Sequence, residues 1–152
     1  MKRSEALAGL SREHHGALSL AVRARRTAAG SDAAALAAMA ATVRDRFQRE
    51  LLPHFEEEER RLLPALARAG ENALAARTLA EHAELAAIVA SLPEAGAGAL
   101  LAFADVLSRH VRFEERELFP ALEALAGEPA TWDLPASSSS PYPAIQGHPH
   151  TS

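Results

Sequence analysis

The segment HFEEEERRLLPAL, residues 54–66, is repeated later in the chain as HVRFEERELFPAL, residues 110–122. Eight of the thirteen aligned positions are identical, among them the leading histidine, a glutamate four residues later and a proline ten residues later. Ordinary surface helices have no reason to repeat such a combination. The repeat therefore indicates a chain built from two similar halves, each with a histidine and a glutamate at a fixed spacing.

The composition favours helices over strands. Alanine supplies 36 of the 152 residues, and Leu, Glu and Arg are also abundant, whereas Val, Ile and Thr together supply only twelve. Because β-branched residues suit strands while Ala, Leu, Glu and Arg suit helices, this composition predicts an all-α protein. The net charge of −4 is ordinary and gives no electrostatic reason to expect a nucleic-acid partner.

Other features restrict the classes of protein that fit. No charge-free apolar run approaches the roughly 20 residues that a membrane-spanning helix needs, and the first residues lack an apolar signal core. We therefore expect a cytoplasmic protein that does not enter a membrane. The chain has no cysteine, which excludes disulfides, thiol chemistry and cysteine-ligated metal sites. Any chemistry must use histidines, carboxylates or the backbone.

Four helical segments are expected, over residues 4–30, 32–70, 71–92 and from the end of the PEAGAG stretch to residue 127. Gly and Pro residues separate them, and short connections make successive helices antiparallel. The expected fold is an up-down-up-down four-helix bundle. Pro64 and Pro120 are expected to bend the ends of their helices.

The chain divides into one domain, residues 1–127, and a Pro- and Ser-rich segment, residues 128–152, which we expect to be a disordered tail. Within the domain the repeat extends further upstream. His15 and His82, on the first and third segments, are each followed by Leu at +3 and Val at +7. The bundle is therefore expected to consist of two helical hairpins in tandem, related by an approximate two-fold axis.

The helical period places the repeated histidines and glutamates on the apolar face. With 100° per residue, Glu58 lies about 40° from His54, within a stripe that also carries large apolar residues, whereas Glu56 lies about 200° away. The second copy places Glu114 beside His110 in the same way. Glu58 and Glu114 are therefore predicted to be buried, and Glu56 to be exposed to solvent.

Burying an unpaired carboxylate costs several kcal/mol, so two of them require compensating charge. Two buried His–Glu salt bridges are one solution and a bound metal is the other. Histidines on all four helices favour the metal, and the ligand types suit two first-row ions bridged by carboxylates, with iron as the leading ion and manganese or zinc as alternatives. The predicted ligands are His15, His54, Glu58, His82, His110 and Glu114.

The first segment offers two adjacent histidines. His14 is central among the leucines of its helix, whereas His15 aligns with His82 by the Leu and Val spacing. This spacing favours His15 as the ligand and leaves His14 as an outer partner or an additional ligand.

These residues resemble the hemerythrin family, also called HHE cation-binding domains. The resemblance rests on the two H-x-x-x-E motifs, each followed by L-[LF]-P, and on the histidines of the first and third segments, and it covers residues 5 to about 126. It implies a four-helix bundle holding a non-haem di-iron centre, with the two glutamates bridging the irons and the histidines as terminal ligands. Family members bind oxygen reversibly, sense oxygen or iron, handle nitric oxide or peroxide, or store iron.

The sequence departs from the oxygen-carrying members in two places. They have two histidines one turn apart on the third helix, but here Thr78 precedes His82 by one turn. They also use Asp five residues after the fourth-helix histidine, where this chain has Glu at +4 and Glu115 at +5. The missing histidine opens a coordination position or passes it to water, His14 or Glu81. This favours reactivity with oxygen or peroxide, or labile iron binding, over reversible transport.

The leading hypothesis is a di-iron protein that binds oxygen or a related small ligand, such as peroxide or nitric oxide, for sensing, buffering or protection, or that binds iron itself. An enzyme with di-iron peroxidase or oxidase-like activity is one alternative. A metal-free or zinc-bound helical interaction domain is the other. Any signalling output would require a separate partner protein.

Overall fold

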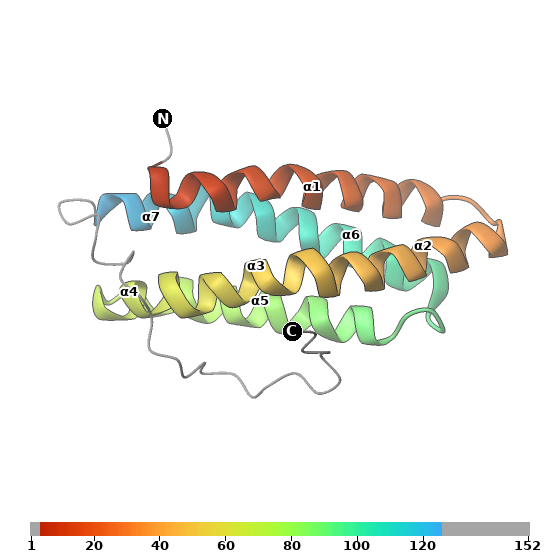
Figure 1. Cartoon of the computed structure of the whole chain (residues 1–152). Helices are drawn as coiled ribbons and strands as arrows, with labels where there is room; N and C mark the ends of the chain where they lie inside the picture. The colour runs from red at the N-terminus through yellow and green to blue at the C-terminus, as the bar shows by residue number, and fades with distance from the viewer. Residues whose placement is uncertain (1–3, 126–152) are drawn as a thin grey trace, which may run out of the picture.

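The computed structural model describes residues 4–125, which form four long helical rods (Figure 1). The first rod is α1 (Glu5–Ala28) and the third is α5 (Asn72–Ala90). The second comprises α2 (Ala33–Arg46), the π-helical turn η1 (Phe47–Leu51), α3 (Leu52–Glu57), the π-helical turn η2 (Glu58–Leu62) and α4 (Leu63–Arg68). The fourth comprises α6 (Gly96–Phe113), the π-helical turn η3 (Glu114–Leu118) and α7 (Phe119–Ala124).

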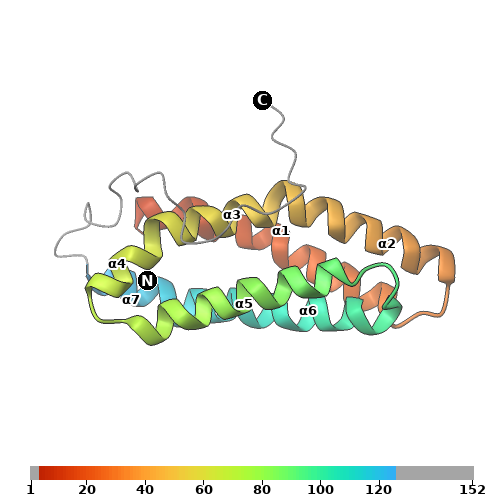
Figure 2. The same ribbon diagram turned by 90° about the horizontal axis from the view of Figure 1, so that it is seen from below.

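The four rods run antiparallel in sequence, and short connections join them at alternate ends of the bundle (Figures 1 and 2). The predicted all-α, up-down-up-down bundle is confirmed, and residues 4–125 contain no strand. In this part of the chain, no helix combines the length and the apolar character needed to cross a membrane. The tail predicted for residues 128–152 lies outside the described residues.

The helix ends follow the expected local chemistry. The carboxylate of Asp32 caps the second rod by accepting hydrogen bonds from the backbone N–H groups of Ala34 and Ala35, at 2.9 and 3.2 Å. These bonds satisfy donors that a helix start leaves free. The same rod ends before Gly70, whose φ of +84° is readily adopted only by a residue without a Cβ. Cap and glycine together fix the length of the second rod.

Three π-helical turns interrupt the second and fourth rods, and a proline follows each of them. Proline has no N–H to donate, and its ring crowds the carbonyl four residues earlier. That carbonyl lies inside the π turn in every case, so the wider turn accommodates the proline within a continuous rod. The pairs, each six residues apart, are Phe47 and Pro53, Glu58 and Pro64, and Glu114 and Pro120.

The sequence did not predict these π turns. From the sequence we expected the prolines to bend helix ends and nothing more. Each π turn adds a residue to one turn of helix, so the 100° step holds only within the α-helical stretches. Leu62, the last residue of η2, and Leu63, the first residue of α4, are both buried.

The core consists of two apolar clusters with a polar layer between them. One cluster, with Leu20 and Phe103 among its fully buried members, fills the end of the bundle near the connection between α1 and α2. The other, which includes Leu66 and Phe119, fills the opposite end. The histidines and glutamates of the repeated motif form the layer between the clusters, where water is largely excluded.

Candidate metal centre

Two fully buried glutamates occupy the middle of the polar layer. Glu58 and Glu114 are both 0% exposed, and each is the first residue of a π turn, η2 or η3. The helical period of the repeated motif predicted that both side chains would face the core. Isolated carboxylates at such positions would be costly, so their partners decide what the layer can do.

Each central glutamate contacts two imidazoles from different helices. Nε2 of His54 and Nε2 of His82 both lie 3.1 Å from the carboxylate of Glu58. Around Glu114, Nε2 of His110 lies at 3.1 Å and Nε2 of His14 at 2.8 Å. The two sets match each other in the way expected for tandem hairpins, because α1 and α5 contribute one histidine each and the repeated motif contributes the other.

In each of these four histidines the second ring nitrogen, Nδ1, contacts another glutamate, which we call an outer carboxylate. In each case Nδ1–H donates a hydrogen bond to a glutamate, which orients Nε2 toward the centre of the bundle. The pairs are His54 with Glu13 at 2.6 Å, His82 with Glu59 at 2.7 Å, His110 with Glu81 at 2.7 Å, and His14 with Glu115 at 2.6 Å. This arrangement is typical of histidines that bind a metal through Nε2.

The inner atoms form two adjoining groups of metal-ligand type. One group consists of His14, His54, Glu58 and Glu114, and the other of Glu58, His82, His110 and Glu114; within each group the ligand atoms lie within 4.8 Å of one another. All of these side chains are buried, and the two groups share both glutamates.

The hydrogen bonding of the central atoms is incomplete. Oε2 of Glu58, Oε2 of Glu114 and Nε2 of His110 are buried and have no hydrogen-bond partner. Buried polar atoms are almost always satisfied, because an unsatisfied one costs about 1–3 kcal/mol. A cation between the two glutamates would satisfy these atoms, so the residues present fit a metal.

The two central carboxylates have opposite pKa shifts. Burial, followed by the nearby charge of Glu114, raises the pKa of Glu58 well above its usual value. Burial also opposes ionisation of Glu114, but the charge of His110 and the hydrogen bond from His14 outweigh it and hold the pKa of Glu114 well below its usual range. The opposite shifts mean that Glu58 takes up a proton more readily than Glu114 when no metal ion is bound.

The imidazoles respond to the same charges. Burial disfavours the charged form of His54, but the carboxylates of Glu58 and Glu114 outweigh it and raise the pKa of His54 to about 11. For His110, burial is again outweighed, chiefly by Glu114, and the pKa rises to about 10. Burial and the charge of His110 lower the pKa of His82 well below its usual value. The metal-free centre therefore stores protons where a metal ion would supply positive charge.

His14, not His15, is the histidine of α1 that enters the centre. His14 is 5% exposed, whereas His15 lies on the solvent side of the helix. The sequence favoured His15 because Leu and Val follow it at the same spacing as they follow His82. That reasoning fails because Leu18 and Val22 are themselves 37% and 51% exposed, so their spacing does not mark the buried face of α1.

Comparison with known families agrees with this geometry. The profile of the hemerythrin HHE cation binding domain matches residues 5–122, most of the chain and nearly all of the described part. The chain belongs to this family. Searches of curated proteins and of solved structures return no significant match. The family and the two buried His/Glu groups together support a metal-binding, hemerythrin-like protein.

The other positions considered as ligands in this HHE domain have outer roles. Glu81 accepts from His110 and also from Arg77, at 3.0 Å, and Glu115 accepts from the hydroxyl of Ser11 at 2.6 Å as well as from His14. Neither glutamate is part of the two inner groups. Both therefore orient histidines and do not face the centre directly.

Thr78, at the position of the missing histidine, is 0% exposed and donates its hydroxyl hydrogen to the carbonyl of Leu74 at 2.8 Å. This bond turns the hydroxyl back onto its own helix. Thr78 is therefore not part of the two inner groups either.

Two outer carboxylates were missed as site residues, Glu13 and Glu59. Glu13 is 62% exposed at its side chain, so no burial pattern would select it, and Glu59, which is buried, lies in the π turn that begins at Glu58. A sequence signal does exist: α1 and α5 each carry the dipeptide Glu-His, and η2 and η3 each begin with Glu-Glu. In each dipeptide one residue faces the centre and its neighbour supports a histidine on another helix.

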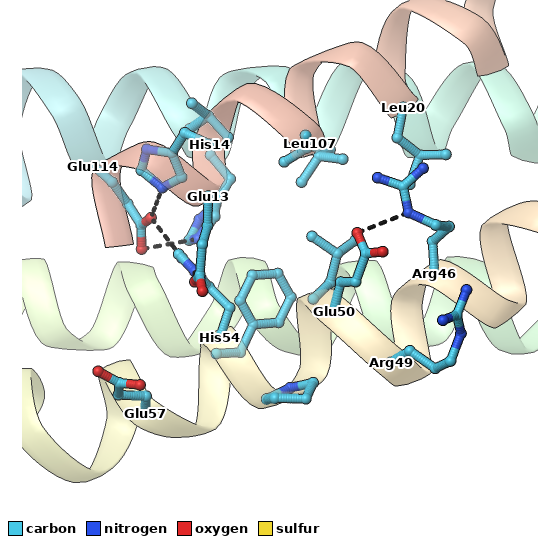
Figure 3. A pocket seen from close by; sticks show the side chains of 17 residues that line it. Glu13, His14, Leu20, Arg46, Arg49, Glu50, His54, Glu57, Leu107 and Glu114 are labelled. Carbon is cyan, nitrogen blue, oxygen red and sulfur yellow. Dashed lines mark hydrogen bonds and ion pairs between the residues drawn. The ribbon is translucent and has the colours of Figure 1, made fainter. Parts of the chain in front are cut away.

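A cavity of about 380 Å³ reaches the centre from one side (Figure 3). Its inner end is lined by His14, His54, His110 and Glu114. His82 and Thr78 are not part of its lining, and the ring of Phe55 stacks on His82 with centroids 3.9 Å apart. The cavity therefore reaches the centre at His14, His54 and His110, whereas His82 is covered by Phe55.

Proposed function

We propose that this protein is a cytoplasmic, non-haem di-iron protein that binds oxygen or a related small ligand, such as peroxide or nitric oxide, for sensing, buffering or protection. The observation that carries the proposal is the pair of four-residue ligand groups that share Glu58 and Glu114. His14 and His54 would hold one iron, His82 and His110 the other, and the shared carboxylates would bridge them.

The donor set supports iron over zinc. Each group offers two imidazoles and two carboxylates, and no thiolate, because the chain has no cysteine. Imidazole and carboxylate suit first-row ions of higher coordination number, and a tetrahedral structural zinc is more often held by a set containing thiolates. When bound, iron ions supply redox chemistry and open coordination positions for small ligands.

Charge balance supports two cations. The four imidazoles are surrounded by six carboxylates, two central and four outer. Even if every imidazole were protonated, the layer would keep an excess of negative charge. Two divalent ions with neutral imidazoles would supply as much positive charge as four protonated imidazoles, and would do so without requiring a proton on either central glutamate.

The protein matrix around the centre limits access to small molecules. The two apolar core clusters enclose the polar layer from both ends, and Phe55 and Phe119 stack on His82 and His14. Access from the cavity side therefore favours ligands that reach the His14 and His54 half.

Metal analysis tests this proposal. Protein loaded with ferrous iron and exposed to air should contain about two irons per chain and show near-ultraviolet and visible absorption bands that the zinc-loaded protein lacks. The Glu58→Ala variant should lose the paired site. A stoichiometry of one iron or none in the unmodified protein would refute the di-iron assignment.

A further inference from the structure

The cavity beside the centre is much larger than a diatomic ligand requires. It has a volume of about 380 Å³, whereas a single water-sized molecule occupies only about 15 Å³ of such space. Cavities of about 300 Å³ and above are typical of sites for small organic molecules. Its size therefore points to an organic ligand that lies next to the metal centre.

The lining of the cavity is divided by polarity along its length (Figure 3). The end near the metal centre carries His14, His54 and Glu114, and the opposite end carries Arg46, Arg49 and Glu50. Between the two ends the wall is largely apolar. It is formed by Ala17, Leu20, Leu51, Phe55, Leu107 and Val111. A complementary ligand would have an apolar body along this wall and a polar group at the arginine end.

The hydrogen bonds that the lining residues already make indicate whether the polar end of the ligand is negative or positive. Every carboxylate that lines the cavity already has a cationic or imidazole partner among the described residues. Glu50 accepts from Arg46 at 2.7 Å, Glu57 from Arg61 at 3.1 Å, Glu13 from His54 at 2.6 Å and Glu114 from His14 at 2.8 Å. Each of these carboxylates is therefore already paired at one oxygen, and the unbonded Oε2 of Glu114 lies at the metal-centre end, away from the arginines.

The donors of Arg46 are not used up in the same way. Its Nε–H binds Glu50, but within residues 4–125 its two terminal nitrogens make no hydrogen bond. The Arg46 side chain is 22% exposed and lines the cavity. A planar guanidinium with free terminal N–H groups matches the two oxygens of a carboxylate.

We propose that the cavity binds a small organic acid with an apolar body. Its carboxylate accepts hydrogen bonds from the terminal nitrogens of Arg46, and its apolar part lies along Leu20, Leu51 and Leu107. The far end of the acid then lies beside the His14 and His54 half of the centre. The inference rests on the proposed function for what the acid does next to a metal, but binding of the acid itself requires no metal.

Calorimetric titration of the metal-free full-length chain tests the proposal, with octanoate, octanol and octylamine as probes. Octanoate should bind at one site per chain. Octanol and octylamine should bind at least about tenfold more weakly, because neither offers a carboxylate to the guanidinium. Equal binding of the three probes, or no saturable binding of octanoate, would overturn the proposal.

Two variants locate the site. Arg46→Gln should weaken octanoate binding at least about tenfold and leave octanol binding unchanged, since only the charged hydrogen bonds are lost. The matched control is Arg25→Gln, which removes an exposed arginine paired with Asp105 on the surface between α1 and α6. It should leave both affinities unchanged.

Gly16→Leu fills the cavity near Arg46, because a Cβ at Gly16 would lie 3.5 Å from Nη2 of Arg46. It should weaken both octanoate and octanol. Unchanged binding in Arg46→Gln or Gly16→Leu would place the acid elsewhere and overturn the proposal.

Repeating the titration on zinc-loaded protein separates this inference from the proposed function. Octanoate that binds only after zinc loading, and regardless of Arg46→Gln, is a metal ligand, which contradicts the arginine site. Metal content is measured in parallel by elemental analysis. A protein that takes up no iron but binds octanoate through Arg46 would refute the di-iron proposal and leave this one standing.

Discussion

Replacing Glu59 by glutamine tests whether the outer carboxylates tune the metal site. The Nδ1–H of His82 donates to Oε2 of Glu59 at 2.7 Å, and the two side chains are only 4% and 7% exposed. Glutamine keeps an acceptor oxygen and the size of the side chain but removes the charge. Losing such a support costs about 10–100-fold in metal affinity, or about 1.4–2.8 kcal/mol.

Glu13 provides an internal comparison, because it makes the same contact in a different environment. Its Oε1 lies 2.6 Å from Nδ1 of His54, but the Glu13 side chain is 62% exposed. Water screens an exposed charge, and such pairs contribute about 1 kcal/mol or less. Glu13→Gln should therefore lower the affinity by about fivefold or less, well below the loss in Glu59→Gln.

The assay is a competition titration of zinc against a chelator of known affinity, at pH 8 and pH 6. Burial, followed by the charge of Glu56, raises the pKa of Glu59 to about 7. Glu59 is therefore mostly ionised at pH 8 and mostly protonated at pH 6, so the difference between Glu59→Gln and the unmodified protein should shrink at the lower pH. The control Glu56→Gln, on the exposed side of α3, should stay within about twofold of the unmodified protein at pH 8. Equal losses in Glu13→Gln and Glu59→Gln, or no loss in Glu59→Gln at pH 8, would refute the reasoning.

Three further predictions concern the centre and its support. Glu58→Ala should reduce the iron content below two per chain, whereas Glu56→Ala should leave content and absorption spectrum unchanged; the reverse result would show that the helical phase is wrong. Metal-loaded protein should unfold at a higher temperature than metal-free protein, with about 2.7 kcal/mol of added stability when free metal exceeds its Kd a hundredfold, and equal melting temperatures would count against buried ligands. Pro64→Ala restores the missing N–H and lets the π turn η2 close into α-helix, which should rotate Glu59 away from His82 and weaken zinc in the chelator competition. Unchanged zinc affinity in Pro64→Ala would show that the proline does not position Glu59.

Local sequence patterns were sufficient to predict the bundle and most of the centre. Composition and period identified four helices, and Gly and Pro residues marked the connections between them. The phase of the repeated motif predicted that Glu58 and Glu114 are buried and that Glu56 is exposed, as the structure shows. These predictions succeed because the direction of a side chain within one α-helix depends on backbone geometry, which residues a few positions apart determine.

The choice of His14 over His15 required the tertiary structure. Both histidines suit the helix, and the tandem repeat supplied a misleading alignment. Only the packing of α1 against α6 shows which side of α1 faces the other helices. The exposed Leu18 and Val22 demonstrate that apolar residues alone do not identify that side.

The outer hydrogen bonds depend on packing to a still greater degree. Glu13 reaches His54 and Glu115 reaches His14 across 41 and 101 residues of sequence. Such contacts depend on how far packed helices are shifted and rotated relative to one another. The spacing of residues within one helix does not determine this. Glu59 lies in a π turn that precedes Pro64, where the 100° step of the α-helix does not apply. The sequence by itself thus determined which residue types face the core, and the packing of the four rods decided which of them meet.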